Sequence, residues 1–201
     1  MNKTVLAATH NRGKLAEFSR ILAPYGIEVL PCEDRELLAS IAEDGQTFEE
    51  NACIKARAVF AAKGIPTLAD DSGLCVDALG GAPGVYSARY AGEGHDDAAN
   101  NAKLMADMRD VPDGERTCRF VSCVALARKG MPVLVAQGTA EGTLLRSAAG
   151  ENGFGYDPYF FYPPLQKSFA QLTAQEKNSV SHRRASLDAL RQALDAEQGE
   201  R

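Results

Sequence analysis

The sequence predicts an α/β fold with a partly antiparallel sheet, and three features lead to this prediction. A short apolar run at residues 4–9 is followed by a segment with helical periodicity, which is typical of a buried strand that leads into a helix. Two longer apolar runs, at residues 119–127 and 132–139, are joined through a Lys-Gly turn and predict an antiparallel hairpin. A last segment with helical periodicity covers residues 180–194. Strands and helices mixed along one chain indicate an α/β protein.

The first two helices have recognisable ends. We expect the first helix from Gly13 to Ala23, with three apolar residues on one face: Leu15, Phe18 and Leu22. Pro24 and Gly26 should end this helix. The second helix begins near Thr47, because Thr47 and Glu50 have the spacing of a capping box, in which the two side chains satisfy free amides of the first turn.

The later elements complete the predicted sheet and its helices. A short strand at residues 67–69 should deliver Asp70-Asp71-Ser72-Gly73 at its C-terminal end, and a glycine-rich loop covers residues 80–84. Residues 141–145 extend the sheet after the hairpin. A third helix carries Leu104, Met105 and Met108, and the last helix has one apolar face: Val180, Leu187, Leu190 and Leu194.

Length and composition limit the kind of protein. The 201 residues fit one domain, which we expect to cover residues 1–201. The net charge of −5 argues against non-specific binding to DNA, RNA or an acidic membrane, so a polyanion would need a local pocket, usually with a divalent metal. The five cysteines are scattered and form no Cys-x-x-Cys, which favours reduced thiols of a cytoplasmic protein over a disulfide or zinc framework.

Asp70 and Asp71 are the first candidates for chemistry. Neighbouring carboxylates repel each other, so a site that keeps both ionised normally holds a cation beside them. Mg²⁺ prefers one or two carboxylates together with phosphates and waters, and a carboxylate near such a metal can accept a proton from an attacking water. The alternative is that these residues form only a polar turn. Asn51 and Lys55 lie one helical turn apart and could both face the same cleft.

The segment from Thr9 to Lys14 is a candidate phosphate site between the first strand and the first helix. Free amides at a helix N-terminus favour anions, Gly13 allows a phosphate to approach closely, and Lys14 adds a positive charge. The segment is not a Walker A motif, because the second glycine and the Lys-Ser/Thr pair are missing. An ordinary strand–turn–helix with a cationic surface is the alternative.

Two later segments have the residue types of a nucleobase site. Glycines on both sides of Phe154 leave its ring open to stacking, although a turn whose aromatic rings pack into the core is the alternative. Lys177 and the run from Ser181 to Arg184 supply hydrogen-bond donors that could pair with a carbonyl, or could form a solvated basic turn. His182 is unsuited to bind a metal, because no partner His or Cys lies at ligand spacing.

In this order, the segments closely resemble the inosine triphosphate pyrophosphatase family, in its bacterial branch. The matching strings, which span essentially the whole chain, are Thr9–Lys14, Thr47–Ala52, Ala69–Leu74, Leu79–Tyr90, Gly153–Pro158 and Ser181-His182-Arg183. The resemblance implies an elongated mixed β-sheet flanked by helices, with two lobes around a central nucleotide cleft. It also implies a cytoplasmic homodimer that uses Mg²⁺ to hydrolyse ITP, dITP and XTP to the monophosphate and pyrophosphate, which removes them from the precursor pool for DNA and RNA synthesis.

The resemblance also assigns roles by position. Asp71 would be the catalytic proton acceptor and a metal ligand, with Asp70 as a second metal ligand. The residues implied in binding the triphosphate are Thr9, His10, Asn11, Arg12, Gly13 and Lys14, and Ser72 would touch the substrate. The residues implied in binding the nucleoside are Phe154, Gly155, Tyr156, Asp157, Lys177, His182 and Arg183.

One metal ligand departs from the family pattern. The resemblance implies a metal-binding glutamate three residues before Gly45, and this chain has Ala42 there. We expect Glu43 to serve as the ligand instead, with Asp44 or a water molecule as the alternatives.

Position six of the purine should decide specificity. Inosine and xanthosine present a carbonyl there and adenine presents an amino group, so donors from His182, Arg183 or backbone amides would favour the first two bases. Two alternative functions stay open: a related pyrophosphatase that prefers modified pyrimidines or other nucleotides, and a nucleotide-binding regulator without catalysis. Ala42 favours the regulator, and the two retained aspartates oppose it.

Overall fold

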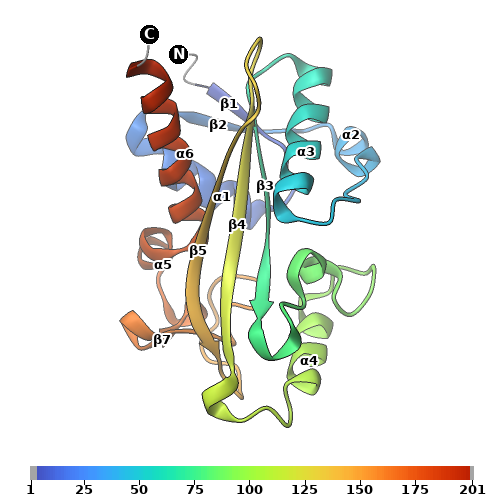
Figure 1. Ribbon diagram of the computed structural model, residues 1–201, viewed down its shortest axis with the longest axis vertical. Coiled ribbons are helices and arrows are strands. Elements are labelled where there is room, and N and C mark those ends of the chain that lie inside the picture. Colours follow the sequence, from blue (N-terminus) through green and yellow to red (C-terminus); the bar gives the residue numbers. More distant parts are fainter. Residues whose placement is uncertain (1–3, 200–201) are drawn as a thin grey trace. The chain divides into compact units, whose positions relative to one another are not determined.

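The computed structural model describes residues 4–199 and contains one seven-stranded sheet with the strand order β2-β1-β3-β4-β5-β6-β7 (Figure 1). Strand β1 pairs in parallel with β2 and β3, whereas β6 is antiparallel to both β5 and β7. The strand bounds are β1 Thr4–Ala7, β2 Glu28–Pro31, β3 Thr67–Val76, β4 Thr117–Ala127, β5 Leu134–Leu144, β6 Phe160–Tyr162 and β7 Lys167–Ser168. The predicted mixed sheet flanked by helices is confirmed.

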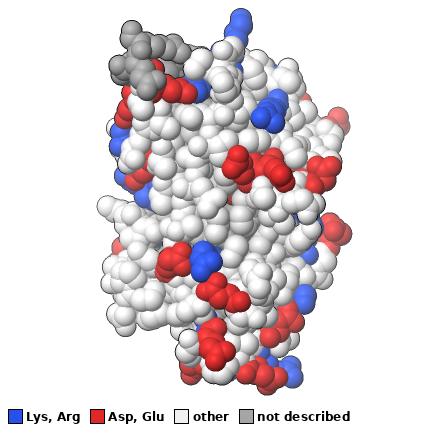
Figure 2. All heavy atoms as spheres, in the orientation of Figure 1, with Lys and Arg blue, Asp and Glu red and all other residues white. Residues whose placement is uncertain are grey.

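Six α-helices accompany the sheet in the described part of the chain. Their bounds are α1 Arg12–Leu22, α2 Arg35–Ser40, α3 Phe48–Lys63, α4 Asp97–Asp107, α5 Ala174–Val180 and α6 His182–Gly199. Short 3₁₀ helices lie at Ala23–Tyr25, Asp77–Leu79, Gly84–Arg89, Asp113–Glu115, Pro163–Leu165 and Phe169–Gln171. None of the described helices is long and apolar enough to cross a membrane. On the face drawn in Figure 2, acidic and basic side chains of the described residues are interspersed.

The chain forms two compact units, each with its own apolar core. The first unit comprises the chain up to Asp71, Ser122–Gly138 and the residues from Arg183 onward, and the second comprises Ser72–Val121 and Thr139–His182. In the first unit, Phe18 of α1 and Leu187 of α6 share a buried cluster with strand residues of β1, β3 and β4. The second unit packs α4 and three buried phenylalanine rings: Phe120, Phe160 and Phe169. The prediction of one domain over residues 1–201 and of a central cleft stays a prediction.

Local signals explain where the helices near the site begin. Asn11 caps α1, because its side chain accepts a hydrogen bond from the Lys14 amide at 3.0 Å. The predicted capping box of α3 is present: Thr47 accepts from the Glu50 amide at 3.1 Å, and the Glu50 carboxylate accepts from the Thr47 amide at 3.2 Å. Both helices therefore start within one residue of the predicted positions.

Three expected elements differ from the structure. Strand β3 is ten residues long, so Asp70-Asp71-Ser72-Gly73 lies inside the strand and not at its end. The expected extension at residues 141–145 does lie in the sheet up to Leu144, but it continues the second hairpin strand without a break, as the last part of β5. The last helix is interrupted at Ser181, whose backbone is extended, so Val180 ends α5 and α6 begins at His182.

Candidate active site

The turn between β1 and α1 brings the predicted phosphate segment to one place in the first unit. Thr9 Oγ1 accepts from the Asn11 amide at 3.1 Å, and Asn11 in turn caps the helix. The side chains of His10 and Arg12 are exposed, while Gly13 and Lys14 are partly buried. The first turn of α1 thus combines free helix amides with the ammonium group of Lys14, an arrangement that favours an anion.

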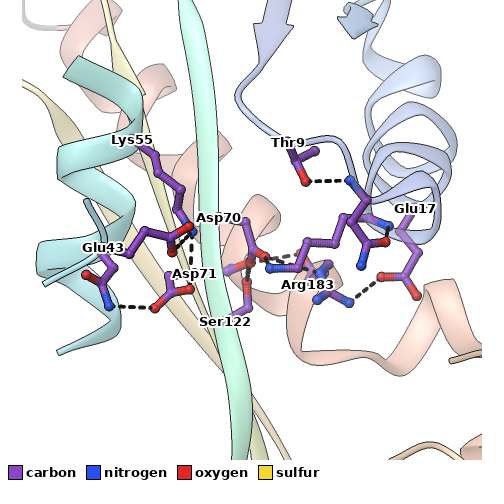
Figure 3. Close-up of polar contacts among 12 residues, drawn as sticks. Thr9, Glu17, Glu43, Lys55, Asp70, Asp71, Ser122 and Arg183 are labelled. Carbon is purple, nitrogen blue, oxygen red and sulfur yellow. Dashed lines mark hydrogen bonds and ion pairs between the residues drawn. The ribbon is translucent and has the colours of Figure 1, made fainter. Parts of the chain in front are cut away.

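Asp70 is held by positively charged and hydroxyl groups (Figure 3). Its Oδ2 lies 2.7 Å from Lys14 Nζ and 3.6 Å from Arg183 Nε, and its Oδ1 accepts from Ser122 Oγ at 2.6 Å. Burial alone would raise the pKa of Asp70, but Lys14, Arg183 and Ser122 together hold the pKa far below its ordinary value. Asp70 is therefore an ionised anchor whose carboxylate fixes the position of Lys14.

Lys14 has the opposite balance. Burial lowers the pKa of Lys14 and outweighs the attraction of Asp70, and the neighbouring positive charges of Lys55 and Arg183 act in the same direction as burial. Because burial and the neighbouring positive charges disfavour the charged form of Lys14, a nearby anion would stabilise that form. This balance suits a residue that meets a phosphate.

Asp71 faces the other side of β3 and contacts residues of α3 (Figure 3). Its Oδ1 lies 3.2 Å from Lys55 Nζ, and its Oδ2 accepts from Asn51 Nδ2 at 3.2 Å. Lys55 Nζ also lies 2.7 Å from Glu43 Oε2. Burial opposes the charge of Lys55, but Asp71 and Glu43 outweigh burial and raise the pKa of the ammonium above its ordinary value.

Asn51 joins the loop that carries Glu43 to Asp71. Its Oδ1 accepts from the Gly45 amide at 2.9 Å while its Nδ2 donates to Asp71. Gly45 is needed in this loop, because a Cβ there would lie 2.7 Å from Asn51 Oδ1. The one-turn spacing of Asn51 and Lys55 predicted that both side chains face the same cleft. In the structure, both side chains contact the Asp71 carboxylate.

Glu43 and Asp71 together fit the ligand chemistry of a hard divalent cation. Their oxygens lie on two sides of one ammonium group, so the space between them already holds a positive charge. Asp70 is less suited as a ligand than Asp71, because its side chain is fully buried and the charges of Lys14 and Arg183 already lie against it. Among the described residues, no group of three or more His, Cys, Asp or Glu side chains could hold a metal ion by itself. Phosphate oxygens and waters would have to complete the coordination, as is usual for Mg²⁺.

Arg183 belongs to the same cluster in the first unit. Its Nη1 lies 2.6 Å from Glu17 Oε2, and both side chains are buried. Glu17 lies one turn after Lys14 on α1. Sequence reasoning missed Glu17 and Ser122, and only the (i, i+3) spacing of Lys14 and Glu17 could have pointed to the first of them. The structure therefore brings Arg183 to the acidic and basic groups around Asp70.

The second unit contains the predicted base-binding residues around Asp157. Lys177 Nζ lies 2.6 Å from Asp157 Oδ2 and 4.6 Å from the centre of the Phe154 ring, within the range of a cation–π contact. The Phe154 side chain is partly exposed, whereas Asp157 and Lys177 are buried. The fold thus brings an aromatic ring, a carboxylate and an ammonium into one group.

Other predicted residues of this unit have structural partners. Tyr156 is buried in the core and its hydroxyl donates to the Ser87 carbonyl at 2.8 Å. His182 is buried and stacks on Phe120 with ring centres 4.8 Å apart. Ser72, the residue after Asp71 in β3, is partly buried.

The fold and these groups define an α/β protein with a mixed sheet and a buried site of paired acids and bases at the start of a helix. Comparison with known proteins is consistent with this class: residues 5–193 match the model of the Ham1 family. The chain belongs to the Ham1 family, which confirms the resemblance found in the sequence.

Relatives match almost the full length. The chain is 48% identical over 197 residues to a protein of Haemophilus ducreyi named dITP/XTP pyrophosphatase, covering 96% of this chain and 100% of that protein. It is 49% identical over 193 residues to a protein of Lactiplantibacillus plantarum with the same name, covering 96% and 95%. The solved structure of a HAM1 protein from Coxiella burnetii superposes with a TM-score of 0.84 at 39% identity, covering 96% of this chain and 98% of that one.

Proposed function

We propose that this chain hydrolyses deaminated purine nucleoside triphosphates (ITP, dITP and XTP) to the nucleoside monophosphate and pyrophosphate. One observation carries the proposal: the Asp71 and Glu43 carboxylates both lie against the Lys55 ammonium, in the same unit as the phosphate-type turn that holds Lys14. The names of the relatives, dITP/XTP pyrophosphatase, supply the substrate class. We also propose, from the resemblance to the family, that the chain forms a homodimer in the cytoplasm.

Asp71 and Glu43 would hold Mg²⁺. When bound, this ion would supply a positive charge that stabilises the leaving pyrophosphate and lowers the pKa of a bound water. Lys55 lies between the two carboxylates and would share this part of the site with the ion. Its flexible stem and three donors suit it to bind a phosphate oxygen.

Asp71 would accept the proton of the water that attacks the α-phosphorus. Asn51 donates to Asp71 Oδ2, which holds the carboxylate plane in place, and the water would share Oδ1 with Lys55. Asp70 would act indirectly, because its ion pair keeps Lys14 extended toward the phosphate chain. Lys14 and the amides of the first turn of α1 would stabilise the charge that develops on the leaving group.

The nucleoside would be bound by residues of the second unit around Phe154. The Phe154 ring would stack on the purine, and Lys177 and His182 would present donors to the carbonyl at position six. A buried donor that meets the amino group of adenine would lose its partner, which costs roughly 1–3 kcal/mol per group. This term would favour ITP and XTP over ATP.

A substrate panel with Mg²⁺ tests the proposal. We expect pyrophosphate release from ITP, dITP and XTP, and far less from ATP, dUTP or methylated pyrimidine triphosphates. The Asp71→Asn variant should lose roughly 10²–10⁴-fold in kcat. Asp34→Asn is a matched control. Asp34 forms an exposed ion pair with Lys63, with 2.6 Å between the charged atoms, and contacts neither Asp71 nor Glu43 among the interactions described. Equal ITP turnover by wild type and Asp71→Asn would contradict the mechanism, and a preference for pyrimidine nucleotides would contradict the substrate class.

A further inference from the structure

The backbone around Phe154 is held by its neighbours in the second unit. The Phe154 amide donates to Asp157 Oδ2 at 2.9 Å, and its carbonyl accepts from the Asp157 amide at 3.3 Å. The two flanking glycines, Gly153 and Gly155, have φ values of +79° and +62°, in the region that other residues rarely adopt. The direction of the Phe154 ring therefore depends on what fixes the peptide groups of these glycines.

Helix α4 holds both polar groups of Gly155. Asp97 Oδ2 accepts from the Gly155 amide at 2.8 Å, and Asn101 Nδ2 donates to the Gly155 carbonyl at 2.9 Å. Asp97 and Asn101 are four residues apart, so they lie on one face of the helix. Asn101 Nδ2 also donates to the Asp97 carbonyl at 2.8 Å, which fixes the orientation of the amide.

Helix α4 is a firm support for these two contacts. Leu104 is fully buried in the core of the second unit, and Asn100 is buried and bridges the Ala88 carbonyl and the Ala91 amide. Asp97 itself is exposed and Asn101 is partly buried. Neither contact is required to fill the core, so removing one should change the loop more than the fold.

We propose that Asp97 and Asn101 are positioning residues, which fix the Phe154 ring in the orientation that stacks on the purine. This inference rests on the proposed function, because it takes Phe154 as the stacking ring. Without the two anchors, Gly155 would regain the freedom that only glycine has, and the orientation of the Phe154 ring would be less restricted, with its contacts to Asp157 and Lys177 still in place. Nucleotide binding would then have to order the loop, which weakens affinity for the base and leaves the phosphate end unaffected.

Alanine and conservative variants separate positioning from folding. We expect Asp97→Ala and Asn101→Ala each to raise KM for ITP, and Ki for IMP, by roughly tenfold, the effect of one lost charged or buried hydrogen bond. Asp97→Asn keeps an acceptor oxygen and should restore most of the affinity. Binding of tripolyphosphate, which has no base, should change less than about twofold in all of these variants.

Asp107→Ala is the matched control on the same helix. Asp107 pairs with Lys103 and accepts from Tyr90, and it makes no contact with residues 153–157 among the interactions described. We expect this variant to keep the wild-type KM. If it raised KM as much as Asp97→Ala does, the effect would come from α4 in general and the positioning role would be overturned.

Amide hydrogen exchange without nucleotide keeps this inference distinct from the proposed function. Asp97→Ala should speed exchange at the Phe154 and Asp157 amides, whose own acceptors stay in place, while the amides of β4 exchange as in the wild type. If wild type fails to hydrolyse ITP, the proposed function fails, and the exchange result still decides whether α4 holds the loop. Unchanged exchange in Asp97→Ala overturns the inference. If the wild-type enzyme hydrolyses ITP, a wild-type KM in both Asp97→Ala and Asn101→Ala also overturns it.

Discussion

Replacing Arg183 by alanine tests how strongly the buried ion pair with Glu17 stabilises the first unit. The exposed fractions of the two side chains are 3% and 6%, and the charged atoms lie 2.6 Å apart. Removing one partner of a buried pair costs about 3–5 kcal/mol, because the other charge stays buried without it. Asp70 keeps Lys14 and Ser122 as partners, so the loss arises mainly at Glu17. We therefore expect the lower end of this range, about 3 kcal/mol in the free energy of unfolding.

The adjacent arginine provides a matched control. Arg184 pairs with Asp188 at the same distance of 2.6 Å, but these side chains are 33% and 30% exposed. An exposed pair four residues apart on a helix contributes about 0.3–0.5 kcal/mol. Arg183→Ala and Arg184→Ala thus remove the same side chain from adjacent positions. The two sites differ in burial and in a second partner, which is Asp70 for Arg183 and the Tyr25 hydroxyl for Arg184. Equilibrium urea unfolding of both variants measures the difference.

Two results would refute this reasoning. The first is an equal loss of unfolding free energy in the two alanine variants, which would show that burial does not strengthen the pair. The second concerns the double variant Glu17→Leu/Arg183→Met, in which apolar side chains replace both charges and should recover most of the lost stability. A double variant no more stable than Arg183→Ala would show that the destabilisation does not come from an uncompensated charge.

Three further predictions concern the fold. Gly73→Ala should lower the free energy of unfolding, measured in urea, by about 1–3 kcal/mol, because a Cβ there would overlap Ser87 and the Gly84 carbonyl. Gly114→Ala is the control, because a Cβ at Gly114 meets open space, and its free energy of unfolding should stay within about 1 kcal/mol of wild type. Thr47→Ala should cost about 1 kcal/mol by the same assay, and no loss would show that the cap of α3 is dispensable. Burial raises the pKa of Cys123 to about 12 and raises the pKa of Cys118 further. Iodoacetamide at about pH 8 should therefore label neither cysteine in the native protein and both in denaturant, and mass spectrometry measures the labelling.

Much of the fold could be predicted because its signals are local. The capping box at Thr47, the apolar stripe of the first helix and the hairpin strands depend on residues close in sequence, and all of them appear near their predicted positions. The break at Ser181 was missed because the apolar periodicity continues across it. The short strands β2, β6 and β7 were missed because two to four residues carry too little pattern.

The site could be predicted only in part, because side-chain pairing depends on contacts far apart in sequence. Motif order pointed to Lys14 and Asp71, but no pattern in the sequence shows that Asp70 binds Lys14 and Ser122, with 52 positions separating Ser122 from Asp70. The partner of Arg183 is 166 positions away, at Glu17. The prediction that Arg183 reads the base also requires it to leave or share this ion pair, so ITP and ATP turnover of Arg183→Ala is the direct test.

The division of the chain into units has a consequence for synthesis on the ribosome. The second unit consists of Ser72–Val121 and Thr139–His182, so all of its residues have been made before Arg183 is added. The first unit begins earlier in the sequence but needs α6, and with it the cation that pairs with Glu17. The segment synthesised first therefore completes its core last. Until Arg183 leaves the ribosome, Glu17 and Asp70 lack this arginine as a partner in an incompletely folded first unit.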